Sequence, residues 1–267
     1  MILVNGVAAV SVAADDRGLM YGDGLFETVL FIEGRAPLWS RHMARFAAGC
    51  ARLLLPAPDI DLLAREATHA SAGQTRVVVR ITLTRGVGPR GYAMADAPQP
   101  TRIVAASPAP IVPPDWYHSG VRVRECTLLL SEQPRLAGIK HLNRLEQVLA
   151  RAEWNDADIA EGILCDAQQR VIGATAANLF AVIGGRLVTP ALERCGIAGV
   201  ARAEVLAHRP DCQVRDLTMT ELMQADEVFL SNSVRGILPV AALDDHRWPI
   251  GEITRALQAH WRVLGLE

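Results

Sequence analysis

The chain has 267 residues, enough for one large domain or two moderate ones. A hydrophobic fraction of 50% and a formal net charge of −2 exclude a wholly disordered chain, and they provide no basic surface for nucleic acid or for an anionic membrane. No apolar run reaches the ~18 residues of a membrane span, and the first basic residue, Arg17, comes too late for a signal peptide. Because the five cysteines are scattered without paired spacing, we expect reduced thiols in a cytoplasmic protein.

The N-terminal part of the chain alternates hairpin and helix signals. The pair Asn5-Gly6 predicts the tight turn of an opening hairpin, and residues 33–35 predict the turn of a second. A helix is predicted over residues 40–55, because apolar residues recur there at helical spacing and Pro56 follows. The further elements predicted here are a helix at 59–72 and strands at 75–84 and 101–107.

A proline-dense segment at residues 107–115 predicts a linker between two domains, one at 1–112 and one at 113–267. The strands predicted beyond it are 121–126, 161–166, 178–183, 185–190 and 226–232, and the helices are 142–154, 199–208 and 251–264. Strands outnumber helices and mostly follow one another as hairpins. We therefore expect an α+β fold rather than a wound sheet of alternating strands and helices.

Only one of the 27 basic residues is a lysine, Lys140; all the others are arginines. A genomic bias toward arginine codons explains the missing lysines but does not explain why this one remains. Arginine stays protonated and cannot form an imine with an aldehyde, whereas a lysine amine can do so once its proton affinity is lowered. Composition alone leaves chance survival and chemical necessity both open.

Lys140 lies in the segment LAGIKHLNRLEQVL, just before a predicted helix, where functional groups commonly reach a pocket. Together with YGDGLFET near the start and ADEVFLSN near the end, this segment resembles the aminodeoxychorismate lyases, a group within the fold-type IV, or class IV aminotransferase, family. The resemblance runs through the whole chain. It implies a small α/β N-terminal domain, a larger barrel-like C-terminal domain that binds pyridoxal 5′-phosphate, and a homodimer.

The same resemblance assigns the cofactor to particular residues. Lys140 would carry the cofactor covalently and move protons during the reaction. Arg45, in the HxxR pattern of RHMARF, would contact the cofactor phosphate, a role that suits a planar and permanently charged guanidinium. His42 lies on the same helix face as Arg45, and packing alone is an alternative role for it.

Two further segments are expected at the phosphate. The glycine before the predicted helix at 199–208 would leave the backbone amides of Val200 and Ala201 free to bind it. The family has a threonine at the position of Ala201, so only amides remain there. Asn232 and Ser233 follow a predicted strand and match a phosphate-binding pair of the family; a capped strand end is the alternative.

The substrate is expected at Thr28, Arg90 and Tyr92. Thr28 lies on a strand that borders the active site in the family, and we favour it as a pocket residue. The loop TRGVGPRGY resembles a lyase loop near the substrate, so that Arg90 would pair with a substrate carboxylate and Tyr92 would form a wall. A flexible surface hairpin is the alternative.

One position departs from the family. Its members carry a glutamate that pairs with the pyridine nitrogen of the cofactor, and here that position is Gly173. Three interpretations stay open: another acid or a water fills the gap, the protein keeps only the fold, or the lyase reaction tolerates a weaker electron sink. We favour the third, because the elimination forms an aromatic ring.

The resemblance therefore implies a lyase that converts 4-amino-4-deoxychorismate to 4-aminobenzoate and pyruvate for folate synthesis. An aminotransferase acting on D-amino acids or branched-chain amino acids is the alternative enzyme, and a non-catalytic protein on the same fold is a third hypothesis. We expect no metal, because the seven histidines lack the spacings of known metal motifs.

Overall fold

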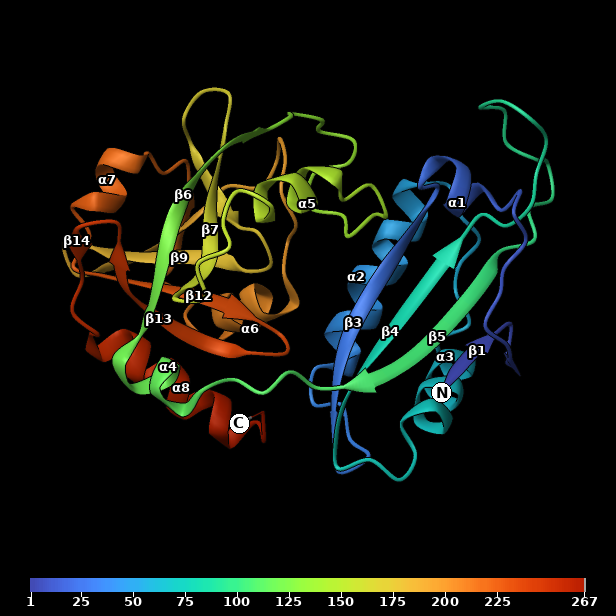
Figure 1. The fold of residues 1–267 in the computed structure, drawn as a ribbon, viewed down its shortest axis with the longest axis horizontal. Coiled ribbons are helices and arrows are strands. Elements are labelled where there is room, and N and C mark those ends of the chain that lie inside the picture. Colours follow the sequence, from blue (N-terminus) through green and yellow to red (C-terminus); the bar gives the residue numbers. More distant parts are fainter. Residues whose placement is uncertain (267) are drawn as a thin grey trace. The chain divides into compact units, whose positions relative to one another are not determined.

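The computed structural model describes residues 1–266, which form two compact units (Figure 1). The first unit comprises Met1–Pro110 together with a short later segment, Ile139–Asn143. The second comprises Ile111–Gly138 and the chain from Arg144 onward. Each unit has its own sheet and its own hydrophobic core.

The sheet of the first unit has five antiparallel strands in the order β2-β1-β5-β4-β3. These strands are β1 (Ile2–Val4), β2 (Val7–Ala8), β3 (Gly24–Ile32), β4 (Arg76–Thr84) and β5 (Thr101–Pro108). The helices of this unit are α1 (Arg17–Tyr21), α2 (Trp39–Arg52) and α3 (Ile60–Ser71). Helices α2 and α3 pack on the sheet (Figure 1), and α3 begins where the Asp59 carboxylate accepts a hydrogen bond from the Leu62 amide.

The two faces of β3 and β4 differ in character, because successive side chains of a strand point to opposite faces. Val29, Val79 and Ile81 are buried against α2 with Phe46. The register pairs Phe26 with Thr82 and Thr28 with Arg80, so these four side chains share the opposite face. That face carries the polar groups discussed below.

The second unit contains a nine-stranded, curled sheet in the order β11-β10-β9-β12-β13-β6-β7-β8, with β14 paired to β13 (Figure 1). Its strands are β6 (Val121–Leu130), β7 (Ile159–Asp166), β8 (Val171–Ala174), β9 (Asn178–Ile183), β10 (Arg186–Pro190), β11 (Gln213–Arg215), β12 (Glu227–Asn232), β13 (Gly236–Leu243) and β14 (His246–Arg247). Its helices are α4 (Pro114–Ser119), α5 (Leu145–Arg151), α6 (Val200–His208), α7 (Met219–Met223) and α8 (Glu252–Val263). Most strand pairs are antiparallel, which confirms the α+β class.

The segment Ile139–Asn143 joins the first unit because its backbone pairs with the start of β3. The Phe26 amide donates to the Lys140 carbonyl at 2.9 Å, and the Leu142 amide donates to the Gly24 carbonyl at 3.0 Å. The helix predicted over 142–154 is wrong in its limits: α5 is shorter, because residues up to Asn143 bond to β3 and not along a helix.

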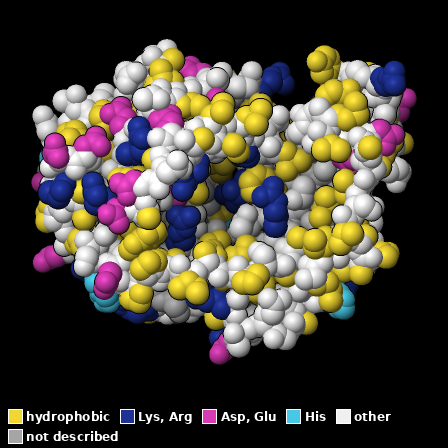
Figure 2. Space-filling model, viewed as in Figure 1, with side chains coloured by type: hydrophobic (Ala, Val, Ile, Leu, Met, Phe, Trp, Pro, Cys, Tyr) yellow, Lys and Arg dark blue, Asp and Glu magenta, His cyan; other side chains and the backbone are white. Residues whose placement is uncertain are grey.

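The composition is reflected in the structure. None of the helices within residues 1–266 is both long enough and apolar enough to cross a membrane. Acidic and basic side chains are interspersed over much of the face shown in Figure 2. All five cysteines are free thiols, and burial raises the pKa of Cys126 and Cys165 to about 12.

Candidate active site

Lys140 and Phe26 form the centre of the polar face in the first unit. The Lys140 Nζ lies 4.3 Å from the ring centroid of Phe26, and the guanidinium carbon of Arg80 lies 3.9 Å from the same centroid. The backbone bond from Phe26 to Lys140 fixes the lysine beside this ring. Thr28, predicted as a pocket residue, shares this sheet face with Arg80.

Arg45 is oriented by a buried carboxylate, Glu27, which is 1% exposed. Arg45 donates to Glu27 through Nε (2.7 Å) and through a terminal nitrogen (2.5 Å). The His42 Nδ1 lies 2.6 Å from the same carboxylate. Burial alone would raise the pKa of Glu27, but the His42 hydrogen bond and the Arg45 charge outweigh it and lower that pKa. The pKa of His42 is lowered by burial, so at neutral pH its imidazole is neutral.

This geometry gives His42 a definite structural part. It helps to hold Glu27, and Glu27 holds the guanidinium of Arg45 in a two-point contact. The HxxR pattern of the sequence placed His42 and Arg45 on one helix face, but it did not identify Glu27 as their common partner.

In the second unit, Asn178 ties the approach to α6 onto the first residue of β9. Its Nδ2 donates to the Ile197 carbonyl at 2.8 Å, and its Oδ1 accepts from the Gly199 amide at 3.0 Å. A Cβ at Gly199 would lie only 2.0 Å from that Oδ1, so the contact requires glycine. The first bond within α6 runs from the Ala203 amide to the Gly199 carbonyl. The amides of Val200 and Ala201 therefore precede the helical bonding pattern, as the prediction for them needs.

Ser231 adds an unsatisfied polar group to this region. Its hydroxyl is buried without a hydrogen-bond partner among residues 1–266. Ser231 pairs directly with Asn178 across β12 and β9, so both side chains lie on one face of the sheet. A buried hydroxyl without a partner carries a desolvation cost that a bound acceptor such as a phosphate oxygen would remove.

The side chain of Asn232 is used in the turn after β12. Its Oδ1 accepts from the amides of Val234 (2.8 Å) and Arg235 (3.1 Å), and its Nδ2 donates to the Ala176 carbonyl at 2.5 Å. Any phosphate contact of this predicted pair would therefore come from the backbone or from Ser233.

Gly173 lies on β8, facing the turn that leads to β9. A Cβ there would lie 3.1 Å from the Ala177 carbonyl oxygen, which is close but leaves room for a side chain. Glu161 is a buried carboxylate near this turn, and it accepts from Arg235 at 2.7 Å, from the Ala176 amide at 3.2 Å and from the Thr175 hydroxyl. Glu161 is thus already bonded to the two turns beside it.

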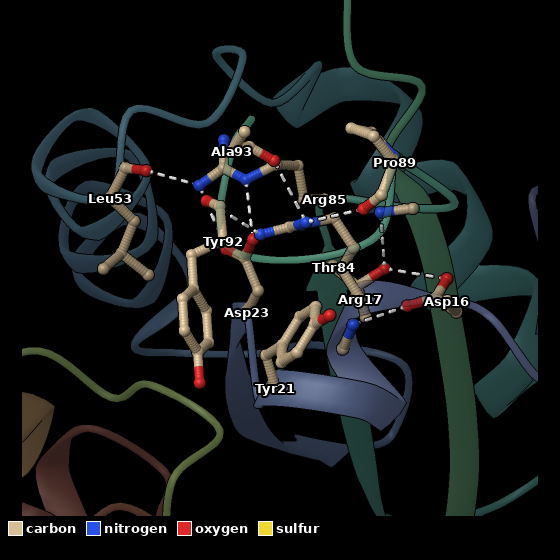
Figure 3. A network of polar contacts seen from close by, with 12 residues as sticks. Asp16, Arg17, Tyr21, Asp23, Leu53, Thr84, Arg85, Pro89, Tyr92 and Ala93 are labelled. Carbon is tan, nitrogen blue, oxygen red and sulfur yellow. Dashed lines mark hydrogen bonds and ion pairs between the residues drawn. The ribbon is translucent and has the colours of Figure 1, made fainter. Parts of the chain in front are cut away.

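The loop that contains Arg90 and Tyr92 is anchored by Arg17 (Figure 3). The buried guanidinium of Arg17 donates to the carbonyls of Gly91 (2.9 Å) and Ala93 (3.2 Å) and to the Asp23 carboxylate (2.9 Å). Asp23 also binds Arg85 through both oxygens. Burial would raise the pKa of Asp23, but the two arginines lower it overall. The side chains of Arg90 and Tyr92 are exposed, so the loop is fixed through its backbone.

Sequence reasoning missed Glu27, Arg80, Asn178, Ser231 and Arg17. A charged residue in a strand or a surface motif gives no local signal that its partner lies elsewhere in the chain. A signal existed only for Asn178, which directly precedes an apolar strand. No group of three or more histidine, cysteine or acidic side chains within residues 1–266 is arranged to hold a metal ion.

The chain belongs to the class IV amino-transferase family, whose model matches residues 24–243. Within that family, an aminodeoxychorismate lyase from Vibrio harveyi is 36% identical over 97% of this chain and 99% of that protein. The crystal structure of 4-amino-4-deoxychorismate lyase from Pseudomonas aeruginosa is 48% identical, with a TM-score of 0.95 and 98% of each chain covered. A D-alanine aminotransferase of Listeria monocytogenes is 28% identical over 92% of each chain.

Proposed function

We propose that this chain is a pyridoxal-phosphate-dependent lyase that converts 4-amino-4-deoxychorismate to 4-aminobenzoate and pyruvate. The observation that carries the proposal is Lys140, the one lysine of an arginine-rich chain, held by backbone bonds beside Phe26. Its segment is part of an alignment with two lyases that covers nearly the whole chain.

The residues present fit the cofactor. Lys140 supplies the amine for its aldehyde, Arg45 is oriented by Glu27 for its phosphate, and the amides of Val200 and Ala201 suit phosphate oxygens. The buried hydroxyl of Ser231 provides a further donor that lacks a partner. When bound, pyridoxal phosphate withdraws electrons from the substrate carbon and so eases the loss of its proton.

Lys140 moves the protons in the proposed reaction. Its neutral amine takes the proton from C4 of the substrate, the bond between the ring and the enolpyruvyl oxygen breaks, and the ring becomes aromatic. The protonated amine then returns a proton to the departing three-carbon unit, which leaves as pyruvate. Thr28 lies on the same sheet face as the Phe26 ring, and Arg90 with Tyr92 would meet a carboxylate of the substrate.

A homodimer and a cytoplasmic location are further parts of the proposal. Leu145, Val148 and Leu149 of α5 are 75%, 60% and 60% exposed, an apolar face of the kind that a second copy covers. The five free thiols suit a reducing compartment. The product 4-aminobenzoate links the chain to folate synthesis.

The test is a turnover assay with purified protein, added pyridoxal phosphate and 4-amino-4-deoxychorismate. We expect fluorescent 4-aminobenzoate and pyruvate to form together, and neither to form with Lys140→Ala. If the wild-type protein releases neither product but transfers the amino group of D-alanine to a 2-oxoacid, the lyase proposal is wrong and the chain is an aminotransferase.

A further inference from the structure

Two cations share one aromatic ring in the first unit. The Arg80 guanidinium and the Lys140 amine both lie within 4.3 Å of the Phe26 ring centroid. An aromatic ring attracts a cation through its negative face, so the ring holds both groups in place although they repel each other. The Arg80 Nε also contacts the Thr82 hydroxyl at 3.4 Å.

Arg80 has no acidic partner to neutralise it. Within residues 1–266 it forms no ion pair with a carboxylate, unlike Arg17, Arg45 and Arg85. Partial burial of its guanidinium lowers the pKa of Arg80, which is the direction expected for a cation without an acid beside it. The side chain keeps its charge at neutral pH, because an arginine pKa lies far above that range.

The other ionisable groups near Lys140 in this unit offset each other. The negative charge of Glu27 is paired with the positive charge of Arg45, and His42 is neutral because burial lowers its pKa. His141 follows Lys140 on an extended segment, where neighbouring side chains point apart. The uncompensated charge that Lys140 meets in its own unit is therefore that of Arg80.

We propose that Arg80 is a positioning residue that keeps the amine of Lys140 in its neutral form by holding a fixed positive charge over the same ring. A lysine beside another cation gains a reactive amine in this way. In the proposed lyase, on which only this consequence rests, the neutral amine is the form that bonds the cofactor aldehyde and takes the substrate proton.

The size of the effect follows from the distances. Two charges that each lie within 4.3 Å of one centroid are at most roughly 8 Å apart. For an effective dielectric constant between those of a protein surface and of water, their repulsion shifts a titration midpoint by about 0.5–1.5 pH units.

The single lysine makes a direct measurement possible. Reductive methylation of the full chain with ¹³C-formaldehyde, before cofactor is added, labels only Lys140 and the amine of Met1. The ¹³C chemical shift of each is then followed against pH in the wild type, Arg80→Gln and Arg80→Met. Arg76→Gln is the matched control, since Arg76 lies on the same strand and the same face of β4.

We expect the Lys140 midpoint to rise by about 0.5–1.5 pH units in both Arg80 variants, and to stay unchanged in the control. The Met1 midpoint should be constant throughout. Cofactor loading at neutral pH, followed by absorbance, should slow about three- to thirty-fold in the Arg80 variants and recover at higher pH. An unchanged Lys140 midpoint in both Arg80 variants, or an equal rise in Arg76→Gln, would overturn the proposal. Because the titration needs no substrate, a shifted midpoint without lyase turnover would refute the proposed function and not this inference.

Discussion

Replacing Gly199 by alanine should disrupt the approach to α6 in a way that the structure makes calculable. The backbone at Gly199 has φ −66° and ψ 146°, which alanine adopts without strain. The new Cβ would, however, lie 2.0 Å from the Asn178 Oδ1. The amide side chain must then move, and its bonds to the Ile197 carbonyl and the Gly199 amide are lost.

Each of those hydrogen bonds is worth about 0.5–1.5 kcal/mol, so Gly199→Ala should lower the free energy of unfolding by about 1–3 kcal/mol. If the amides of Val200 and Ala201 bind the cofactor phosphate, their displacement should also weaken pyridoxal-phosphate binding about ten- to hundred-fold. Urea unfolding of the cofactor-free chain measures the first effect, and a fluorescence titration with pyridoxal phosphate measures the second.

A double-mutant cycle separates the clash from general damage. Asn178→Ala alone loses the same two bonds, and it also removes the atom that the alanine would strike. The double variant should therefore be about as stable as Asn178→Ala, which makes the two changes strongly non-additive. Additive losses, or a Gly199→Ala protein with wild-type stability, would refute the reasoning.

The remaining predictions concern three other sites. Gly173→Glu restores a carboxylate where there is room for a side chain, and it should add measurable transamination of D-alanine; a variant with unchanged lyase rate and no transaminase activity would contradict the weak-sink interpretation. The pKa of Glu27 is lowered in the folded state, so its stabilising contribution is present above the unfolded value of about 4.5 and is lost as pH falls below it. In Glu27→Gln, unfolding measured between pH 3 and 6 (roughly the window of that titration) should therefore lose part of its pH dependence, and an identical profile would speak against the buried ion pair. Arg17→Ala removes the anchor of the Arg90 loop, so hydrogen exchange at Gly91 and neighbouring amides should quicken at least about ten-fold. Unchanged protection there would show that other contacts hold the loop.

Local patterns in the sequence predicted most strands well. The strand predicted at 178–183 is β9, and the one predicted at 226–232 agrees with β12 to within one residue. Apolar runs of this kind, bounded by turn residues, are decided largely by neighbouring residues. The helix predicted at 59–72 likewise corresponds to α3.

Long-range pairing explains what the sequence could not predict. The helix predicted from residue 142 begins three residues later, because the Leu142 amide bonds to the Gly24 carbonyl more than a hundred residues away. The roles of Arg17 and Glu27 were hidden for a similar reason. A charged residue is normally predicted to be exposed, and only the folded chain shows that each is buried with partners distant in sequence.

The assignment of cofactor and substrate contacts depended on the family resemblance. The site residues other than Lys140 had no signal of their own in composition or spacing, and their roles at the cofactor and substrate stay predictions. The structure adds local reasons for some of them: Arg45 is held by Glu27, and the amides of Val200 and Ala201 stand before the first bond of α6. For Asn232, it shows a side chain already used in a turn.

The central claim is that the amine of Lys140 carries out the lyase reaction, and Lys140→Arg tests it most directly. Arginine keeps the positive charge and the affinity for the Phe26 ring, but it cannot form the bond to an aldehyde. With 4-amino-4-deoxychorismate and pyridoxal phosphate, the wild-type protein should release 4-aminobenzoate and pyruvate in equal amounts. The folded Lys140→Arg protein should release neither above the uncatalysed rate. Turnover by that variant near the wild-type rate would contradict the account.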